Sequence, residues 1–279
     1  MIGIATDSNA QLAPELVDRY GIEVVPLTVT VDGREHLEGL GLDADAFYAH
    51  FTDDHRPEVG TSQPSPGQFA VAYEDLIARG CTEILSIHLS AALSGTLNSA
   101  RLAAHSTAIP VRVVDSGTAS FGIGCCVWAA AEAVAHGATL DQAAQVAEQL
   151  APTIGNVFVV GVTQFLRDGG RGGGATDGPG LAVLTLRDGE VQVLARCDTM
   201  LDTVHAMAAY ALGWGEHLFV AVGHSDASSL PIADALADAV GAAANVSEVV
   251  RYRVGPSVGV HTGPGTAGLF VFSAGITAR

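Results

Sequence analysis

Apolar runs that alternate with helical segments constrain the fold of this chain more than any other feature. Such alternation is typical of strands covered on both faces by helices, as in a mainly parallel sheet. Strands are expected at residues 2–6, 23–31 (followed by a turn at 31–34), 83–88, 111–114, 157–162, 218–223 and 268–273. Helices are expected at residues 11–20, 43–52, 66–79, 95–105, 120–136, 139–150, 200–213 and 229–242. The fold class is therefore α/β.

The second half of the chain contains a different strand pattern. Asp188-Gly189 separates two alternating runs within residues 181–194, which predicts a β-hairpin. We expect two α/β lobes: residues 1–155 with a mainly parallel sheet, and residues 156–279 with a mixed sheet that includes the hairpin.

The charge and hydropathy of the chain exclude several classes of partner. A formal net charge of −17 leaves no basic stripe for nucleic acid or for anionic lipid. The amino terminus has no basic region before a long apolar segment, so no secretion signal is expected. The longest apolar stretch, around residues 125–131, meets Glu132 before it could span a membrane. A cytoplasmic protein without an integral membrane segment is expected.

The cysteines favour the same compartment. The four cysteines contain no C-x-x-C pair, and two of them are adjacent at Cys125 and Cys126, where a mutual disulfide would be strained. Free, buried thiols in a reducing environment are expected.

A hydroxyl-rich segment, His88–Ala100, joins the apolar run at 84–87 to a helical pattern. Hydroxyl groups and free backbone N–H groups at a helix amino terminus can hold an anion. Ser94 could simply be the N-cap of that helix. Gly95, however, would let a ligand approach the backbone closely, and Ser90, Ser94 and Thr96 supply more hydroxyls than one cap requires.

Three other polar segments are expected at strand ends, where open α/β sheets bind ligands. They are Thr61–Ser65, Asp115-Ser116 and His261–Thr266. Thr61 and Ser62 could bind a ligand or cap the helix that follows. His261, expected in a strand before a glycine-rich turn, could be a hydrogen-bonded packing residue or could face the cleft and titrate near neutrality.

Catalytic alternatives are weaker on the sequence. Ser94, His261 and Asp115 supply the residue types of a hydrolase triad, but the G-x-S-x-G nucleophile pattern is absent. No H-E-x-x-H, no P-loop and no G-x-G-x-x-G after the first strand occurs, so neither a metal nor a nucleotide cofactor is expected. The glycine-dense residues 169–174 are expected to form an exposed, flexible loop that presents Arg171.

Seven motifs in order make the chain resemble the DegV family, bacterial fatty-acid-binding proteins that serve as carrier subunits for fatty acid kinase. The motifs are Asp7-Ser8, Val25-Pro26-Leu27, Thr61-Ser62-Gln63-Pro64-Ser65, Leu93-Ser94-Gly95-Thr96, Val114-Asp115-Ser116, Gly169-Gly170-Arg171 and His261-Thr262-Gly263-Pro264-Gly265. The resemblance spans nearly the whole chain. The residues after Gly-Gly-Arg depart from the family's usual short helix and Lys-Pro-Ile-like strand.

The resemblance implies two α/β domains with a buried long-chain fatty acid such as palmitate. It implies that Thr61 and Ser94 grip the carboxylate, with Ser62, Gly95 and His261 beside them. It further implies a non-catalytic carrier, expected as a monomer, whose cargo is phosphorylated by a separate ATP-dependent kinase that docks at Arg171. Two alternatives stay open: an acyl hydrolase that uses Ser94 and His261, and a binding protein for a short carboxylate or phosphate.

Overall fold

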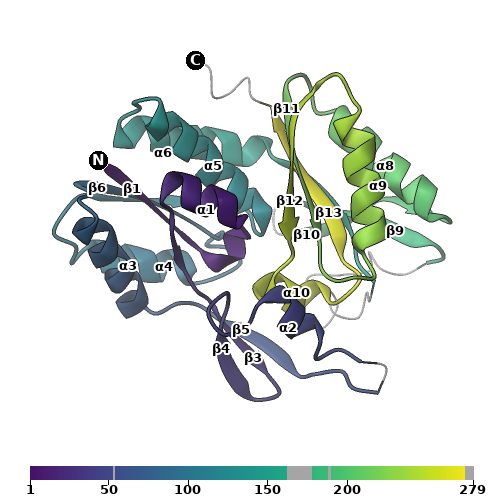
Figure 1. Ribbon diagram of the computed structural model, residues 1–279, viewed down its shortest axis with the longest axis horizontal. Coiled ribbons are helices and arrows are strands. Elements are labelled where there is room, and N and C mark those ends of the chain that lie inside the picture. Colours follow the sequence, from purple (N-terminus) through teal and green to yellow (C-terminus); the bar gives the residue numbers. More distant parts are fainter. Residues whose placement is uncertain (53, 162–177, 188–189, 274–279) are drawn as a thin grey trace. The chain divides into compact units, whose positions relative to one another are not determined.

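The structure is a computed structural model that describes residues 1–52, 54–161, 178–187 and 190–273. Figure 1 shows the order of its elements along the chain. Two compact units divide it: unit 1 comprises Met1–Gly41 and Gly60–Thr153, and unit 2 comprises Leu42–Val59 and Ile154–Ala278. We predicted two continuous lobes, residues 1–155 and 156–279. In the structure, residues 42–59 instead belong to unit 2.

Unit 1 is built on a four-stranded parallel sheet in the order β2-β1-β6-β7, as the sequence predicted. The strands are β1 (Ile2–Asp7), β2 (Glu23–Val25), β6 (Glu83–His88) and β7 (Val111–Asp115). The helices are α1 (Pro14–Tyr20), α3 (Pro66–Ala78), α4 (Thr96–Ala104), α5 (Phe121–Ala135) and α6 (Leu140–Leu150), with short 3-10 helices η1 (Ser8–Ala10) and η2 (Ala151–Thr153).

Helices cover both faces of this sheet. Figure 1 shows α3 and α4 on one face and α5 and α6 on the other. Phe69, Tyr73 and Leu76 of α3 pack with Ala5 of β1 and Ile84 of β6 in one buried cluster. Because all four strands run in parallel, their carboxyl ends meet at one edge, which places the segments after β1, β6 and β7 together.

A smaller sheet follows the order β4-β3-β5, with β3 (Thr28–Val31), β4 (Arg34–Leu37) and β5 (Val59–Ser62). Asp32 and Gly33 have φ of 47° and 75°, the left-handed pair that a tight antiparallel hairpin requires. The single strand predicted at residues 23–31 is wrong. Pro26 lacks an N–H for the sheet ladder, so β2 ends at Val25 and β3 begins two residues after the proline.

Unit 2 is built on a mixed sheet in the order β10-β9-β8-β13-β11-β12. The strands are β8 (Gly155–Val159), β9 (Leu181–Arg187), β10 (Glu190–Cys197), β11 (Leu218–His224), β12 (Val246–Arg253) and β13 (Ala267–Ser273). Within the described residues of this sheet, β11 and β12 pair in parallel and the other neighbouring strands pair antiparallel. The predicted pairing of the two hairpin strands is confirmed, while Asp188 and Gly189 lie outside the described residues. Strand β12 escaped prediction because charged residues interrupt its apolar pattern at this sheet edge.

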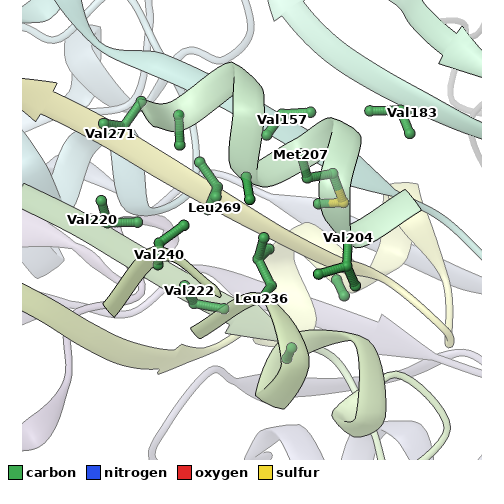
Figure 2. Close-up of a cluster of buried hydrophobic side chains, with 14 of the residues drawn as sticks. Val157, Val183, Val204, Met207, Val220, Val222, Leu236, Val240, Leu269 and Val271 are labelled. Carbon is green, nitrogen blue, oxygen red and sulfur yellow. The ribbon is translucent and has the colours of Figure 1, made fainter. Parts of the chain in front are cut away.

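The core of unit 2 lies under α8 (Met200–Leu212) and α9 (Leu230–Gly241). Figure 2 shows Val204 and Met207 of α8 and Leu236 and Val240 of α9 directed toward strand residues such as Leu269. Aliphatic side chains build this core almost alone, which fits a chain with 6% aromatic residues.

His261 lies in a helix, α10 (Pro256–Thr262), and its predicted position in a strand is wrong. Pro256 occupies the first turn, where a helix does not need its missing N–H. Gly263 ends the helix with φ of 71°, a conformation that glycine adopts without strain. The segment Val258-Gly259-Val260 therefore coils despite its apolar, strand-like composition.

Two further expectations concern the thiols and the membrane. All four cysteines are free and buried, as predicted. Among the described residues, no helix combines the length and the apolar character that crossing a bilayer requires.

Candidate functional site

The segment after β6 forms a closed turn in front of α4. The N–H groups of Leu93 and Ser94 both donate to the carbonyl of Ser90, at 2.9 and 3.1 Å. The N-cap of α4 is Gly95, so the interpretation of Ser94 as the N-cap is wrong. Ser94 Oγ instead accepts the N–H of Thr96 at 3.2 Å and lies 2.9 Å from Thr96 Oγ1.

This geometry leaves the amino end of α4 suited to an anion. Gly95 offers no side chain to the amides of the first turn, whereas the neighbouring α3 carries a full capping box from Ser65 and Gln68. Ser94 already accepts one N–H, so its own hydroxyl proton can point to a ligand while Thr96 donates to Ser94. Together these groups present donors at the positive end of a helix dipole.

Thr61 and Ser62 lie in β5 and are exposed. They do not cap α3, because Ser65 does so: its hydroxyl accepts the N–H of Gln68 at 3.3 Å. The expected loop is thus a strand end followed by a short turn. The capping interpretation of Thr61 and Ser62 is wrong.

Gln63 brings this strand end against the Ser94 turn. A Cβ at Gly95 would lie 2.0 Å from Gln63 Oε1, so the carboxamide occupies the space beside the glycine. The amide Nε2 donates to Ser99 Oγ in α4 at 3.3 Å. The absence of a side chain at Gly95 therefore allows this contact between the two motifs. Sequence reasoning assigned no role to Gln63.

A buried hydrogen-bonded chain lies behind the same turn. Asp7 and His88 have no exposed side-chain surface, and Asp7 Oδ2 lies 3.0 Å from His88 Nδ1. His88 Nε2 lies 2.6 Å from Ser86 Oγ, which lies 2.9 Å from the Tyr73 hydroxyl. Burial raises the pKa of Tyr73 to about 12, and the bond to Ser86 opposes part of that shift.

Sequence reasoning did not identify these hydrogen-bonded side chains. Ser86 and His88 stand at alternate positions of a strand that is covered on both faces, so both side chains point into the core beneath α3 and α4. Polar residues at alternate positions in an apolar strand are the pattern that would have indicated it, because a buried polar group needs a partner.

Side chains of the Asp7-Ser8 and Asp115-Ser116 motifs accept backbone N–H groups near the carboxyl ends of β1 and β7. Ser8 Oγ accepts the N–H of Leu27 at 2.9 Å and donates to the carboxylate of Glu38. Asp115 accepts the N–H of Gly117 at 2.9 Å and lies 3.4 Å from the N–H of Ala91. The carboxylate of Asp115 thus binds backbone amides, which removes support for its role in a hydrolase triad.

In unit 2, Asp226 organises the turn that follows α10. Its carboxylate accepts the N–H of Gly265 at 3.0 Å and the hydroxyl of Ser228 at 3.0 Å. Burial raises the pKa of Asp226, but hydrogen bonds from the Gly265 amide and the neighbouring hydroxyls outweigh it and leave that pKa below its ordinary value. The cluster anchors the glycine-rich turn next to His261.

The remaining candidate residues are placed as follows. His261 is partly buried on α10 in unit 2. Arg171 and the glycine-dense loop lie outside the described residues. Their predicted roles stay predictions. Across the described ranges, no three His, Cys, Asp or Glu side chains group so as to hold a metal ion.

Comparisons with known proteins cover almost the whole chain. The family described as "Uncharacterised protein, DegV family" matches residues 1–274. A DegV domain-containing protein of Streptomyces coelicolor is 38% identical, and the match covers 98% of each chain. A Thermus thermophilus structure described as "Fatty Acid Binding of a DegV family Protein" is 30% identical with a TM-score of 0.88, over 98% of this chain and 99% of that one. A Thermotoga maritima structure described as revealing fatty acid binding function is 25% identical with a TM-score of 0.84, over 98% and 99%.

Proposed function

The chain belongs to the DegV family, and from this premise we propose that it is a non-catalytic carrier that binds a long-chain fatty acid. The carrier presents the carboxylate to a separate ATP-dependent fatty acid kinase, which forms the acyl-phosphate. The Thermus and Thermotoga relatives, described as fatty-acid-binding, support the ligand class. The kinase partnership follows from the family resemblance.

The contact between Gln63 and Gly95 carries the proposal for the headgroup site. It brings the segment of Thr61 and Ser62 against the turn that holds Ser94. Ser94 donates its hydroxyl to the carboxylate, Thr61 and Ser62 are the candidate ligands of the neighbouring strand end, and the amides of the first turn of α4 complete the donors. His261 is a further candidate ligand on the family resemblance alone.

The free energies of tail burial and of headgroup hydrogen bonding differ in size. Burial of about 14 methylene groups contributes on the order of 11 kcal/mol before association costs, at roughly 0.8 kcal/mol each. One hydroxyl contact contributes about 0.5–1.5 kcal/mol net, and somewhat more to a charged acceptor. The tail therefore sets affinity, and the hydroxyls set the orientation of the carboxylate.

Hydroxyl donors also suit a carrier that must hand over its cargo. A bidentate arginine would hold the attacking carboxylate and neutralise it, whereas single hydroxyl and imidazole contacts leave it reactive. Arg171 is proposed as the docking residue for the kinase and not as a carboxylate ligand.

Identification of the ligand tests the proposal directly. Protein purified from a bacterial host is expected to release a C14–C18 acid on denaturing extraction, detected by mass spectrometry. Delipidated protein that binds no such acid would contradict the carrier role.

Ser94→Ala separates orientation from retention. The variant is expected to keep its lipid with affinity reduced about tenfold or less, while phosphorylation by the kinase falls much further. Ser106→Ala is a matched control, because the Ser106 hydroxyl donates to the carbonyl of Ala103 at the far end of α4. Equal and complete loss of both readouts would contradict the division of labour. Turnover of p-nitrophenyl esters that Ser94→Ala abolishes would favour an acyl hydrolase.

A further inference from the structure

The buried pair of Asp7 and His88 lies at the start of the segment that leads to Ser94, where Asp7 accepts the N–H of Leu89. We propose that this pair is a positioning device that sets the preference of the site for a carboxylate over an uncharged headgroup. The inference rests on the proposed function. It concerns residues that have no predicted contact with the ligand.

Three N–H groups face the two carboxylate oxygens of Asp7. Oδ1 accepts the N–H of Asn9 at 3.1 Å, and Oδ2 accepts the N–H of Leu89 at 3.0 Å and faces His88 Nδ1 at 3.0 Å. A buried carboxylate without such donors would be strongly destabilising. Asp7 therefore holds the first residue after β6 at a defined place.

From Leu89 the constraint passes along the backbone to Ser94. The next residue, Ser90, donates its N–H to the carbonyl of Thr118 at 3.0 Å. The carbonyl of Ser90 then accepts the N–H of Ser94 at 3.1 Å. A shift of Leu89 would rotate the Ser90 carbonyl and displace the Ser94 hydroxyl with it.

His88 is held from its other side as well. One neutral tautomer satisfies the whole chain: Tyr73 donates to Ser86, Ser86 donates to Nε2, and Nδ1–H donates to Asp7. The ring of Phe69 packs against the imidazole edge to face, with centroids 4.9 Å apart. The imidazole cannot turn without breaking one of these contacts.

Orientation matters more for an acid than for an alcohol. A carboxylate gains charge-assisted hydrogen bonds only when the donors converge on it, whereas a fatty alcohol depends mainly on burial of its tail. Displacement of Ser94 therefore lowers affinity for the acid and changes affinity for the alcohol little.

The test measures the dissociation constants of delipidated protein for palmitate and for hexadecanol. Asp7→Asn replaces one acceptor oxygen by a donor that faces an N–H group, and we expect the preference for palmitate to fall about tenfold. Leu76→Ala is the control. Leu76 is a buried core residue that lies beside Gly3 near the opposite end of β1. It is expected to lower the unfolding midpoint without changing that preference.

Two substitutions at His88 separate positioning from packing. The amide of Asn stands near the place of Nδ1, so His88→Asn can still donate to Asp7. The amide of Gln reaches the place of Nε2, so His88→Gln keeps Ser86 and loses Asp7. We expect His88→Asn to retain the preference for palmitate within about threefold and His88→Gln to behave as Asp7→Asn.

The outcomes distinguish the two proposals. A wild-type preference for palmitate that survives in both Asp7→Asn and His88→Gln overturns the positioning role alone. A wild-type protein that binds both ligands equally overturns this inference and leaves the fatty acid carrier standing. A wild-type protein that binds neither ligand overturns the proposed function and this inference with it. If Asp7→Asn does not fold, amide hydrogen exchange decides: faster exchange at Ser94 in His88→Gln than in His88→Asn supports the role, and equal exchange overturns it.

Discussion

Gln63 occupies the space that the missing side chain of Gly95 leaves open, with its Oε1 atom 2.0 Å from the place of a Cβ. The two residues belong to different motifs, 32 positions apart, and each motif supplies a proposed carboxylate ligand. A single glycine thus allows a strand end and a helix amino terminus to lie in direct contact.

Gly95→Ala is expected to displace the Gln63 carboxamide and weaken fatty acid binding about tenfold or more, because its new methyl group overlaps the amide. Titration of delipidated protein with palmitate measures the effect. Gly67→Ala is the control, since its Cβ would lie 3.7 Å from Ser65 Oγ, in ordinary contact. Undiminished binding in Gly95→Ala would contradict the role of the contact. The double variant with Gln63→Ala is expected to show smaller loss than the sum of the two single changes, because the overlap is gone.

Gly259→Ala is expected to destabilise the protein by about 1–3 kcal/mol through overpacking. Its Cβ would lie 2.5 Å from Tyr48 Oη and 2.7 Å from Phe47 Cε1, where α2 (Ala44–Tyr48) packs on α10. Denaturant unfolding measures the change. Gly241→Ala in α9, whose Cβ would be 3.9 Å from Val249 Cγ2, is expected to be neutral or stabilising. An unchanged free energy of unfolding in Gly259→Ala would contradict the predicted overpacking between α2 and α10.

Tyr73 makes stability fall in alkali. Its pKa is raised from 10.0 to about 12 by burial, against the opposing bond from Ser86, so above pH 10 the unfolded chain ionises while the folded protein stays neutral. The contribution of Tyr73 to the free energy of unfolding is therefore fully present below pH 10. It is lost between pH 10 and pH 12, by roughly 1.4 kcal/mol per pH unit. Tyr73→Phe is expected to lack this component. The sequence contains no lysine, so no lysine titrates in that window. Parallel pH profiles for the two proteins would contradict the assignment.

Native thiols are expected to resist alkylation. Burial raises the pKa of Cys126 from 9.0 to about 12, and burial with the neighbouring thiol raises that of Cys125 well above 9.0. At pH 8 the thiolate fraction of Cys126 is then roughly a thousandfold below that of a free cysteine. Iodoacetamide labelling followed by mass spectrometry, with urea-unfolded protein as the comparison, measures this. Rapid labelling of these two residues without unfolding would contradict their burial.

Local patterns were sufficient for most of the fold. Strand 83–88 was predicted with the boundaries that the structure gives, and α3, α5 and α6 begin within a residue of their predicted starts. Apolar periodicity and caps depend on neighbours in the chain, which a sequence displays. Where chemistry conflicted with apolar composition, as at Pro26 and in α10, prediction failed because proline and glycine determine the backbone more strongly than apolar runs do.

The amino-acid sequence by itself determined the α/β class, the parallel sheet of unit 1, the antiparallel hairpin strands, the buried thiols and the family resemblance. Only the tertiary structure decided that Gln63 lies on Gly95 and that Asp7 pairs with His88, 81 positions away. The physical reason is that periodicity reports which face of an element is buried, while partners across elements depend on how those faces meet. The residues proposed to bind the carboxylate can be read from motifs, but the residues proposed to hold them in place are defined by contacts between distant parts of the chain.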